Sequence, residues 1–191
     1  MRTTIRKPRG LRARRRTAGD SFAGCLFFCV LLIGGVSWAY FHFYRLWDLD
    51  HPLEGHHIVA DSSAETTNTY RLHVIRQVLG RARGAQQRVG GLYRGTRDGS
   101  LSEEDFRQES FEVEQELLDS IKDMKSRSVP KSFEKAHLEV AGAIGEAYKA
   151  LTYLRQAREA EQPQALLEQA RAAWQNSQKL FEHARGGYGS V

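Results

Sequence analysis

Histidines are the side chains of this sequence best suited to chemistry, and the chain has seven of them. His51, His56 and His57 lie in one short segment among carboxylates, and imidazole with carboxylate is a ligand set that suits Zn²⁺ or Cu²⁺. The carboxylates of this segment are Asp48, Asp50, Glu54 and Asp61. Their spacing matches no ordered metal motif, so we expect no metal site in the segment.

Three other histidines, His73, His137 and His183, are weak candidates for a metal site in the body of the chain. His137 falls on the apolar stripe of a predicted helix, whereas His73 and His183 are each one position off theirs. In an antiparallel bundle all three would lie at one level, so a shared site stays an alternative. We expect His137 to be structural, kept neutral by burial, with one ring nitrogen bonded to a neighbouring helix. His137→Leu is then tolerated or mildly stabilising, and neither metal nor cofactor is expected.

Other catalytic groups are not placed to act. The sequence has no nucleophile, carboxylate pair or glycine-rich phosphate loop in a context that would position it. Both cysteines, Cys25 and Cys29, lie inside an apolar segment. We therefore expect no enzymatic activity.

The positive charge of the chain is concentrated at one end. Residues 1–20 hold eight basic side chains and one acidic one, which leaves 20 basic and 22 acidic side chains for all the rest. The high pI thus belongs to a short tail, and the body does not have the charge of a nucleic-acid-binding protein.

A membrane-spanning helix is predicted at residues 21–44, which contain no Asp, Glu, Lys or Arg. At 1.5 Å per residue such a segment crosses a hydrocarbon core of about 30 Å. The basic tail predicts a cytoplasmic N-terminus, a single pass through the cell (inner or plasma) membrane and an extracytoplasmic C-terminal domain. Cleavage as a signal peptide near Ser37-Trp38-Ala39 is one alternative. A Gly35-xxx-Ala39 pair leaves a homodimer open.

Beyond a juxtamembrane linker at 45–60, residues 61–186 predict a bundle, followed by a disordered tail at 187–191. Four segments place apolar or small residues alternately three and four apart, the spacing of one helix face. The four series are Leu72, Ile75, Leu79, Ala82, Gln86, Val89, Tyr93; Phe106, Ser110, Val113, Leu117, Ile121, Met124; Phe133, His137, Val140, Ile144, Ala147, Leu151, Leu154; and Leu167, Ala170, Trp174, Ser177, Phe181, Ala184.

Capping residues and short connections predict how these helices are joined. Ser62 with Glu65 forms a capping box before the first helix, Ser102 caps the second, and Gly186-Gly187 ends the fourth. The first helix is the least secure and is expected to fray from Gly90. Short connections make neighbours antiparallel, so the expected fold is all-α: one transmembrane helix, then an up-down-up-down four-helix bundle with coiled-coil-like packing. We expect residues 61–191 to fold without the anchor.

The charges of the first two predicted helices are opposite. Residues 66–97 carry seven arginines and no acid, and nine acidic residues follow between 103 and 123. The arginines could dock an anionic polymer or headgroup. We favour pairing between the two helices, which orients them although each exposed pair contributes only about 0.2–1 kcal/mol.

Residues 130–184, the run PKSFEKAH followed by an alanine-rich helical hairpin, resemble the helical domains of uncharacterised bacterial envelope proteins. The resemblance covers under a third of the chain and implies no activity.

An anchor, a bundle and no catalytic constellation together predict a function in binding. We expect a membrane-anchored extracytoplasmic helical interaction or scaffold module, with the lipid bilayer and a protein as its partners. The alternative is a sensor-type helical bundle that binds a ligand or a metal and acts through a partner.

Overall fold

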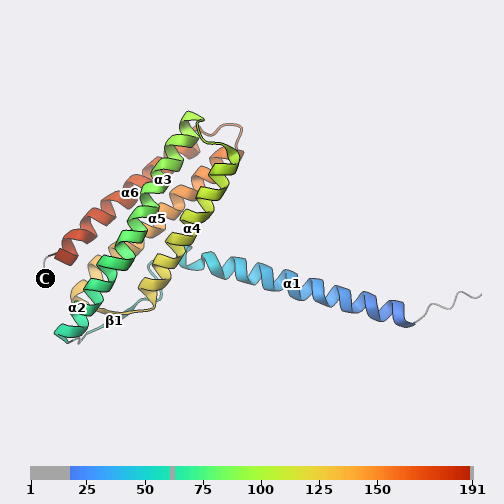
Figure 1. The fold of residues 1–191 in the computed structure, drawn as a ribbon, viewed down its shortest axis with the longest axis horizontal. Helices are drawn as coiled ribbons and strands as arrows, with labels where there is room; N and C mark the ends of the chain where they lie inside the picture. Colours follow the sequence, from blue (N-terminus) through green and yellow to red (C-terminus); the bar gives the residue numbers. More distant parts are fainter. Residues whose placement is uncertain (1–17, 61–62, 190–191) are drawn as a thin grey trace, which may run out of the picture. The chain divides into compact units, whose positions relative to one another are not determined.

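The computed structural model describes residues 18–60 and 63–189, and it is mostly helical, with helices packed as a bundle (Figure 1). The α-helices are α1 (Ala18–Asp50), α2 (Ala64–His73), α3 (Gly80–Asp98), α4 (Glu103–Lys125), α5 (Glu134–Glu159) and α6 (Gln164–Gly189). The shorter elements are the π-helix η1 (Val74–Leu79), the 3₁₀-helix η2 (Lys131–Phe133) and the strands β1 (His57–Val59) and β2 (Ser128–Pro130).

The chain divides into two compact units, one ending at His42 and the other beginning at Phe43. In the first unit, the side chains of Phe27 and residues 29–39 on α1 are all exposed. The predicted span 21–44 lies in α1, but the side chains of 21–26, 28 and 40–44 are outside the described set, as is the tail from 1 to 17. Within the described part of the chain, no helix is both long and apolar enough to cross a membrane.

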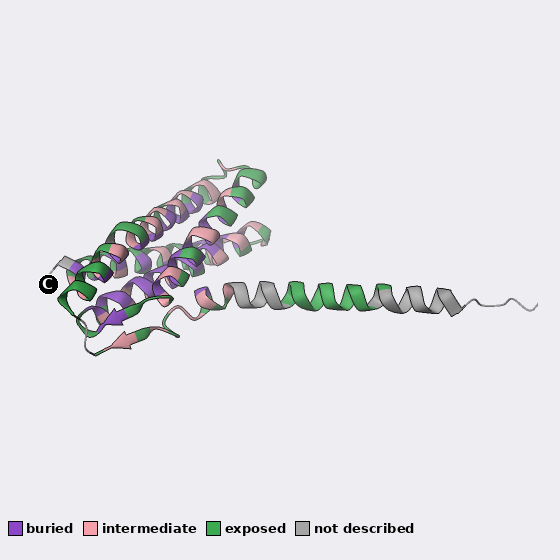
Figure 2. Cartoon of the chain, turned by 60° about the horizontal axis from the view of Figure 1, so that its bottom comes forward, coloured by how far each residue is buried: buried purple, intermediate pink, exposed green. Residues whose placement is uncertain are grey.

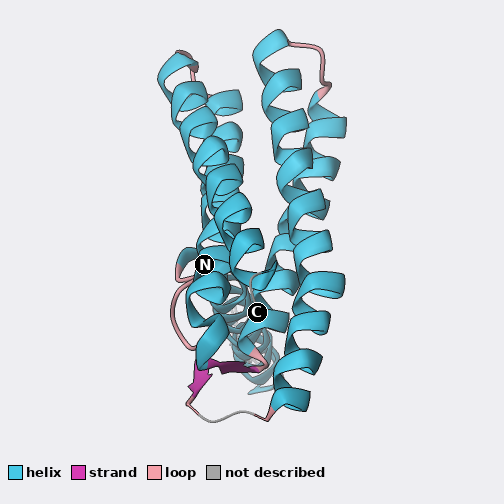
Figure 3. Cartoon of the chain, turned by 90° about the vertical axis from the view of Figure 1, so that its left-hand side faces the viewer, coloured by secondary structure: helices cyan, strands magenta, loops and turns pink. Residues whose placement is uncertain are grey.

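In the second unit, α3, α4, α5 and α6 lie side by side (Figures 1 and 3). The connections 99–102 and 160–163 lie at one end of these helices, and the connection that contains β2 lies at the other. β1 pairs in parallel with β2, so that His57, Ile58 and Val59 lie opposite residues 128–130. Buried side chains line the faces that the helices turn towards one another (Figure 2).

The predicted apolar stripes are confirmed for the second, third and fourth helices, whose members are buried apart from the half-buried Trp174. In the first helix the prediction is wrong near its start, because Leu72 is 49% exposed while Tyr70, Val74 and Val78 are buried. The cause is η1: its wider π turns, closed by i→i+5 bonds, take more residues per turn, so the buried face before η1 is displaced from the series that α-helical spacing predicts.

The first helix also does not fray at Gly90. The structure continues it to Asp98, and Gly99, with φ +65°, ends it in the left-handed conformation. Gly90 serves close packing: an added Cβ would lie 2.6 Å from Cζ2 of Trp174, whose Nε1 donates to the carbonyl of Gln86 at 3.2 Å. The indole therefore occupies the space that any side chain at position 90 would need.

Residues 46–60, most of the predicted linker, are packed on the bundle. Leu49 is buried, and Lys125 donates to Asp48 at 2.9 Å and to the carbonyl of His51 at 3.0 Å. Pro52 packs against α5 where Gly145 leaves room, since an added Cβ there would lie 2.5 Å from Pro52 Cγ. The segment is thus part of the second unit, held by apolar, ionic and backbone contacts.

Two predicted helix ends differ from the structure. The N-cap of α2 is Ser63, whose Oγ accepts from the backbone of Thr66 at 3.1 Å, so the cap is one residue later than predicted. α6 runs past Gly186-Gly187 to Gly189, and Tyr188, which we expected in a disordered tail, is buried. Burial of this ring against the core gives the last turn a reason to stay helical.

Ion pairs join the arginine-rich and acidic helices. Arg81 bonds to Asp123 at 2.8 Å, and Arg88 lies 2.8 Å from Glu109 and 3.2 Å from Glu116. These side chains are 33–41% exposed, so the pairs orient α3 against α4 more than they stabilise the fold.

Candidate functional site

His137 lies near the start of α5, with no exposed surface, and both of its ring nitrogens are hydrogen-bonded. Nδ1 is hydrogen-bonded to the hydroxyl of Tyr70 on α2, and Nε2 lies 2.7 Å from Nδ1 of His56. His56 in turn lies 2.7 Å from the carbonyl oxygen of Pro52 through its Nε2. One buried side chain therefore connects α2, α5 and the segment that precedes β1.

The carbonyl of Pro52 sets the direction of every bond in this chain. A carbonyl only accepts, so His56 donates from Nε2 and, being neutral, accepts at Nδ1. His137 must then donate from Nε2 to His56, which leaves its Nδ1 to accept from the hydroxyl of Tyr70. All three side chains are neutral in this arrangement, and each tautomer is fixed by its neighbour.

Burial keeps the network neutral. It lowers the pKa of His137 from 6.5 to about 3, with the nearby His56 as the second cause. Burial also lowers the pKa of His56 and raises that of the Tyr70 hydroxyl. The expectation of a neutral, buried His137 bonded to a neighbouring helix agrees with this geometry.

Aromatic rings enclose the network on the side of α6. Phe133 stacks on Tyr70 with ring centroids 5.8 Å apart, and Tyr188 lies 5.5 Å from Phe133. The buried Tyr188 hydroxyl interacts with that of Tyr70, and burial raises the pKa of Tyr188 to about 12. Water is thus kept from the Tyr70–His137 bond.

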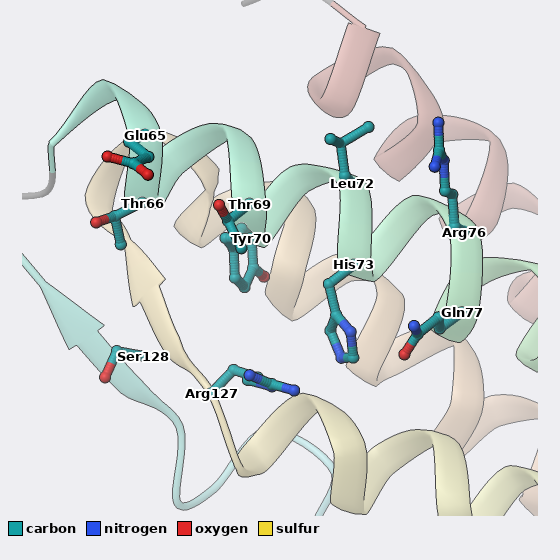
Figure 4. A pocket seen from close by; sticks show the side chains of 10 residues that line it. All are labelled: Glu65, Thr66, Thr69, Tyr70, Leu72, His73, Arg76, Gln77, Arg127 and Ser128. Atoms are coloured by element: carbon teal, nitrogen blue, oxygen red, sulfur yellow. The ribbon is translucent and has the colours of Figure 1, made fainter.

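A pocket of about 660 Å³ lies beside Tyr70, between α2–η1 and the connection from α4 to β2 (Figure 4). Most of the residues that line it have a polar group: Glu65, Thr66, Thr69, Tyr70, Leu72, His73, Arg76, Gln77, Arg127 and Ser128. In Figure 4, His73 and Gln77 point from the helix towards the gap in which Arg127 lies. The pocket thus collects hydrogen-bond donors at one end of the bundle.

The histidines considered in the sequence analysis lie in different parts of the structure. His73 lies at the pocket, His183 is exposed on α6, and His137 is bonded to His56 instead of either. Of the linker histidines, His51 stacks on Trp47 with centroids 3.8 Å apart, and His57 is exposed. Among the described residues, no group of three or more His, Cys, Asp or Glu could hold a metal ion.

Sequence reasoning missed Tyr70 and His56 as the partners of His137. Tyr70 was off the stripe because the spacing of an α-helix was assumed where η1 widens the turn. His56 was grouped with its linker neighbours, and nothing local marks its bond to a residue 81 positions away.

Chemically, the histidine network suits a structural connection better than proton transfer. Both nitrogens of His137 are engaged, its ring has no exposed surface, and the chain of bonds ends at a carbonyl that cannot take up a proton. The pocket, in contrast, offers exposed cationic side chains and free volume for a ligand. Fold and site together define a helical bundle with a pocket at one end. Comparisons with protein families, curated proteins and solved structures found no match to this chain.

Proposed function

We propose that this protein is a membrane-anchored helical module that acts by binding a partner protein, without catalysis. Residues 21–44 are the anchor, and the bundle is an up-down-up-down four-helix scaffold outside the cytoplasm. The lipid bilayer is the second partner. The anchor contains Gly35 and Ala39, which leave open a homodimer formed through this helix.

The observation that carries the anchor is the exposure of α1. Residues 29–39 are three turns of helix, and all of their side chains are exposed. Seven large apolar side chains, one at position 27 and six within residues 29–39, are 51–71% exposed, among them Ile33 and Trp38. A helix that is apolar on every side needs an apolar environment, and a bilayer supplies it.

Charge supports the orientation. The eight basic side chains of residues 1–20 precede the uncharged segment, whereas Asp48, Asp50 and Glu54 follow it. Basic residues are retained on the cytoplasmic side, and this supports a bundle on the opposite side.

A binding role is supported by what the bundle offers. The titratable groups of its core are engaged with one another, as His137 is with Tyr70 and His56, so they are poorly placed to act on a substrate. The exposed sides of α3 and α4 carry charged side chains such as Arg94 and Glu104, which can make complementary charge contacts with a partner.

Reporter fusions and alkaline extraction test the proposal. A phosphatase fused after Val191 should be active, a fluorescent protein exported unfolded at the same place should be dark, and the protein should stay with membranes at alkaline pH. The matched control carries Ile33→Arg and Val36→Arg, which should release the protein from the membrane. Recovery of the wild type in the soluble fraction, or the reverse reporter pattern, would contradict the proposal.

Crosslinking in native membranes followed by affinity purification tests the partner. A protein recovered with the wild type, and lost when the surface charges of α3 or α4 are reversed, supports a binding module. A catalytic turnover that depends on a residue of the bundle would overturn it.

A further inference from the structure

The pocket beside Tyr70 has the size and the groups of a ligand site. Its volume of about 660 Å³ lies within the usual range of roughly 300–1,000 Å³ for small-molecule pockets. α2 and η1 form one wall, and Arg127 and Ser128, where α4 leads into β2, form the other (Figure 4). Tyr70 also lines the pocket, and its hydroxyl is already bonded to His137.

The cations of this pocket lack the acidic partners that other arginines of the bundle have. Arg81, Arg83 and Arg88 each pair with a carboxylate of α4 or α6. Arg76 and Arg127 make none of the ion pairs found among the described residues, and both are exposed. The only acidic residue in the lining is Glu65, in the first turn of α2. The positive charge is therefore available for an anion.

A buried donor or acceptor in the same pocket is also unsatisfied. Nε2 of His73 is buried and has no hydrogen-bond partner in the described residues, although buried polar atoms are almost always paired. His73 and Gln77 point to the same side of the helix at its junction with η1 (Figure 4). π turns are rare and are found frequently at functional sites.

The kinds of donor present indicate the chemistry of the ligand. Guanidinium groups match the oxygens of phosphate in paired hydrogen bonds. The hydroxyls of Thr69 and Ser128 and the ring of His73 add donors from other directions. Leu72 and Tyr70 supply apolar surface for the carbon part of an ester.

We propose that this pocket binds a phosphate ester through Arg127, with His73 and Gln77, which point towards it, as neighbouring donors (Figure 4). The proposal concerns the bundle alone and does not depend on the membrane anchor. The phosphate comes either from a soluble ester or from a lipid headgroup, and the two sources are separated by experiment.

The test titrates the full chain, in phosphatidylcholine nanodiscs, with glycerol 3-phosphate in a buffer free of other polyanions. Saturable binding is expected, together with a change in the imidazole ¹⁵N signals of His73. Arg127→Gln should weaken binding about tenfold or more, the usual contribution of a hydrogen bond to a charged group. The position is exposed, so the variant should melt like the wild type.

Arg94→Gln is the matched control, because Arg94 is exposed on α3 and does not line the pocket. It should change binding less than twofold.

Nanodiscs that contain phosphatidic acid decide the source of the phosphate: competition with glycerol 3-phosphate indicates a headgroup site, and the absence of competition indicates a soluble ester. Equal or tighter binding of succinate, equal effects of Arg127→Gln and Arg94→Gln, or no saturable binding at millimolar concentrations would overturn the proposal.

Discussion

Replacing His137 with leucine should destabilise the bundle near neutral pH, and the penalty should shrink in acid. The variant leaves the Tyr70 hydroxyl without its acceptor in a buried position and His56 without its donor. Each unsatisfied group costs about 1–3 kcal/mol, and the gain from burying a leucine offsets part of this. The expectation from sequence alone, a tolerated or stabilising change, is therefore reversed by the two bonds that the structure reveals.

The pH dependence follows from the lowered pKa. Unfolded His137 takes up a proton near its ordinary value of 6.5, whereas the folded side chain does so only near 3. Its neutral burial thus stabilises the fold fully above pH 6.5, and this contribution is lost as pH falls from 6.5 towards 3. The slope approaches about 1.4 kcal/mol per pH unit, or roughly 3 kcal/mol by pH 4. The lowered pKa of His56 acts in the same direction.

Urea denaturation of the full chain at pH 7 and pH 4.5 measures this effect. The free energy of unfolding of the wild type should exceed that of His137→Leu at pH 7, and the difference should narrow by about 2–3 kcal/mol at pH 4.5. Comparison with the variant removes the contribution of carboxylates that titrate in the same range. His183→Leu, at an exposed histidine of α6, should show no such narrowing. A gap for His137→Leu that does not change with pH would refute the assignment of a neutral, buried His137.

Two further substitutions test the packing around this network. Tyr70→Phe removes the hydroxyl that bonds to His137 and should lower the free energy of unfolding by about 1–2 kcal/mol, whereas no change in urea denaturation would show that the bond contributes nothing. Gly145→Ala pushes a methyl group against Pro52 and should cost about 1–3 kcal/mol in the same assay. Its control is Gly84→Ala, in a helix interior with open space around it, which should stabilise by up to about 1 kcal/mol. A Gly145→Ala variant as stable as the Gly84→Ala variant would show that Pro52 does not pack there.

How far the sequence predicts this fold depends on how local the determining contacts are. The stripes through Val113, Ile144 and Phe181 were predictable, because α-helical spacing is a property of neighbouring residues. The face at Tyr70 was not, since η1 departs from that spacing without a marker in the sequence. The bond from His137 to His56 and the approach of Arg127 to His73 depend on where distant segments meet, and single-sequence patterns do not carry that information.

Because residues 46–60 pack on the bundle, the folding unit starts earlier in the chain than the boundary predicted from the sequence. A fragment that begins at residue 61, where composition alone puts the boundary, would lack the strand that pairs with β2 and would expose the surface that Leu49 covers. It would also leave His137 with an unpaired Nε2–H. A fragment that begins at Phe43 keeps all three contacts. Work on the isolated bundle should therefore start upstream of Leu46, and instability of a shorter fragment would reflect the missing segment and not a defect of the helices.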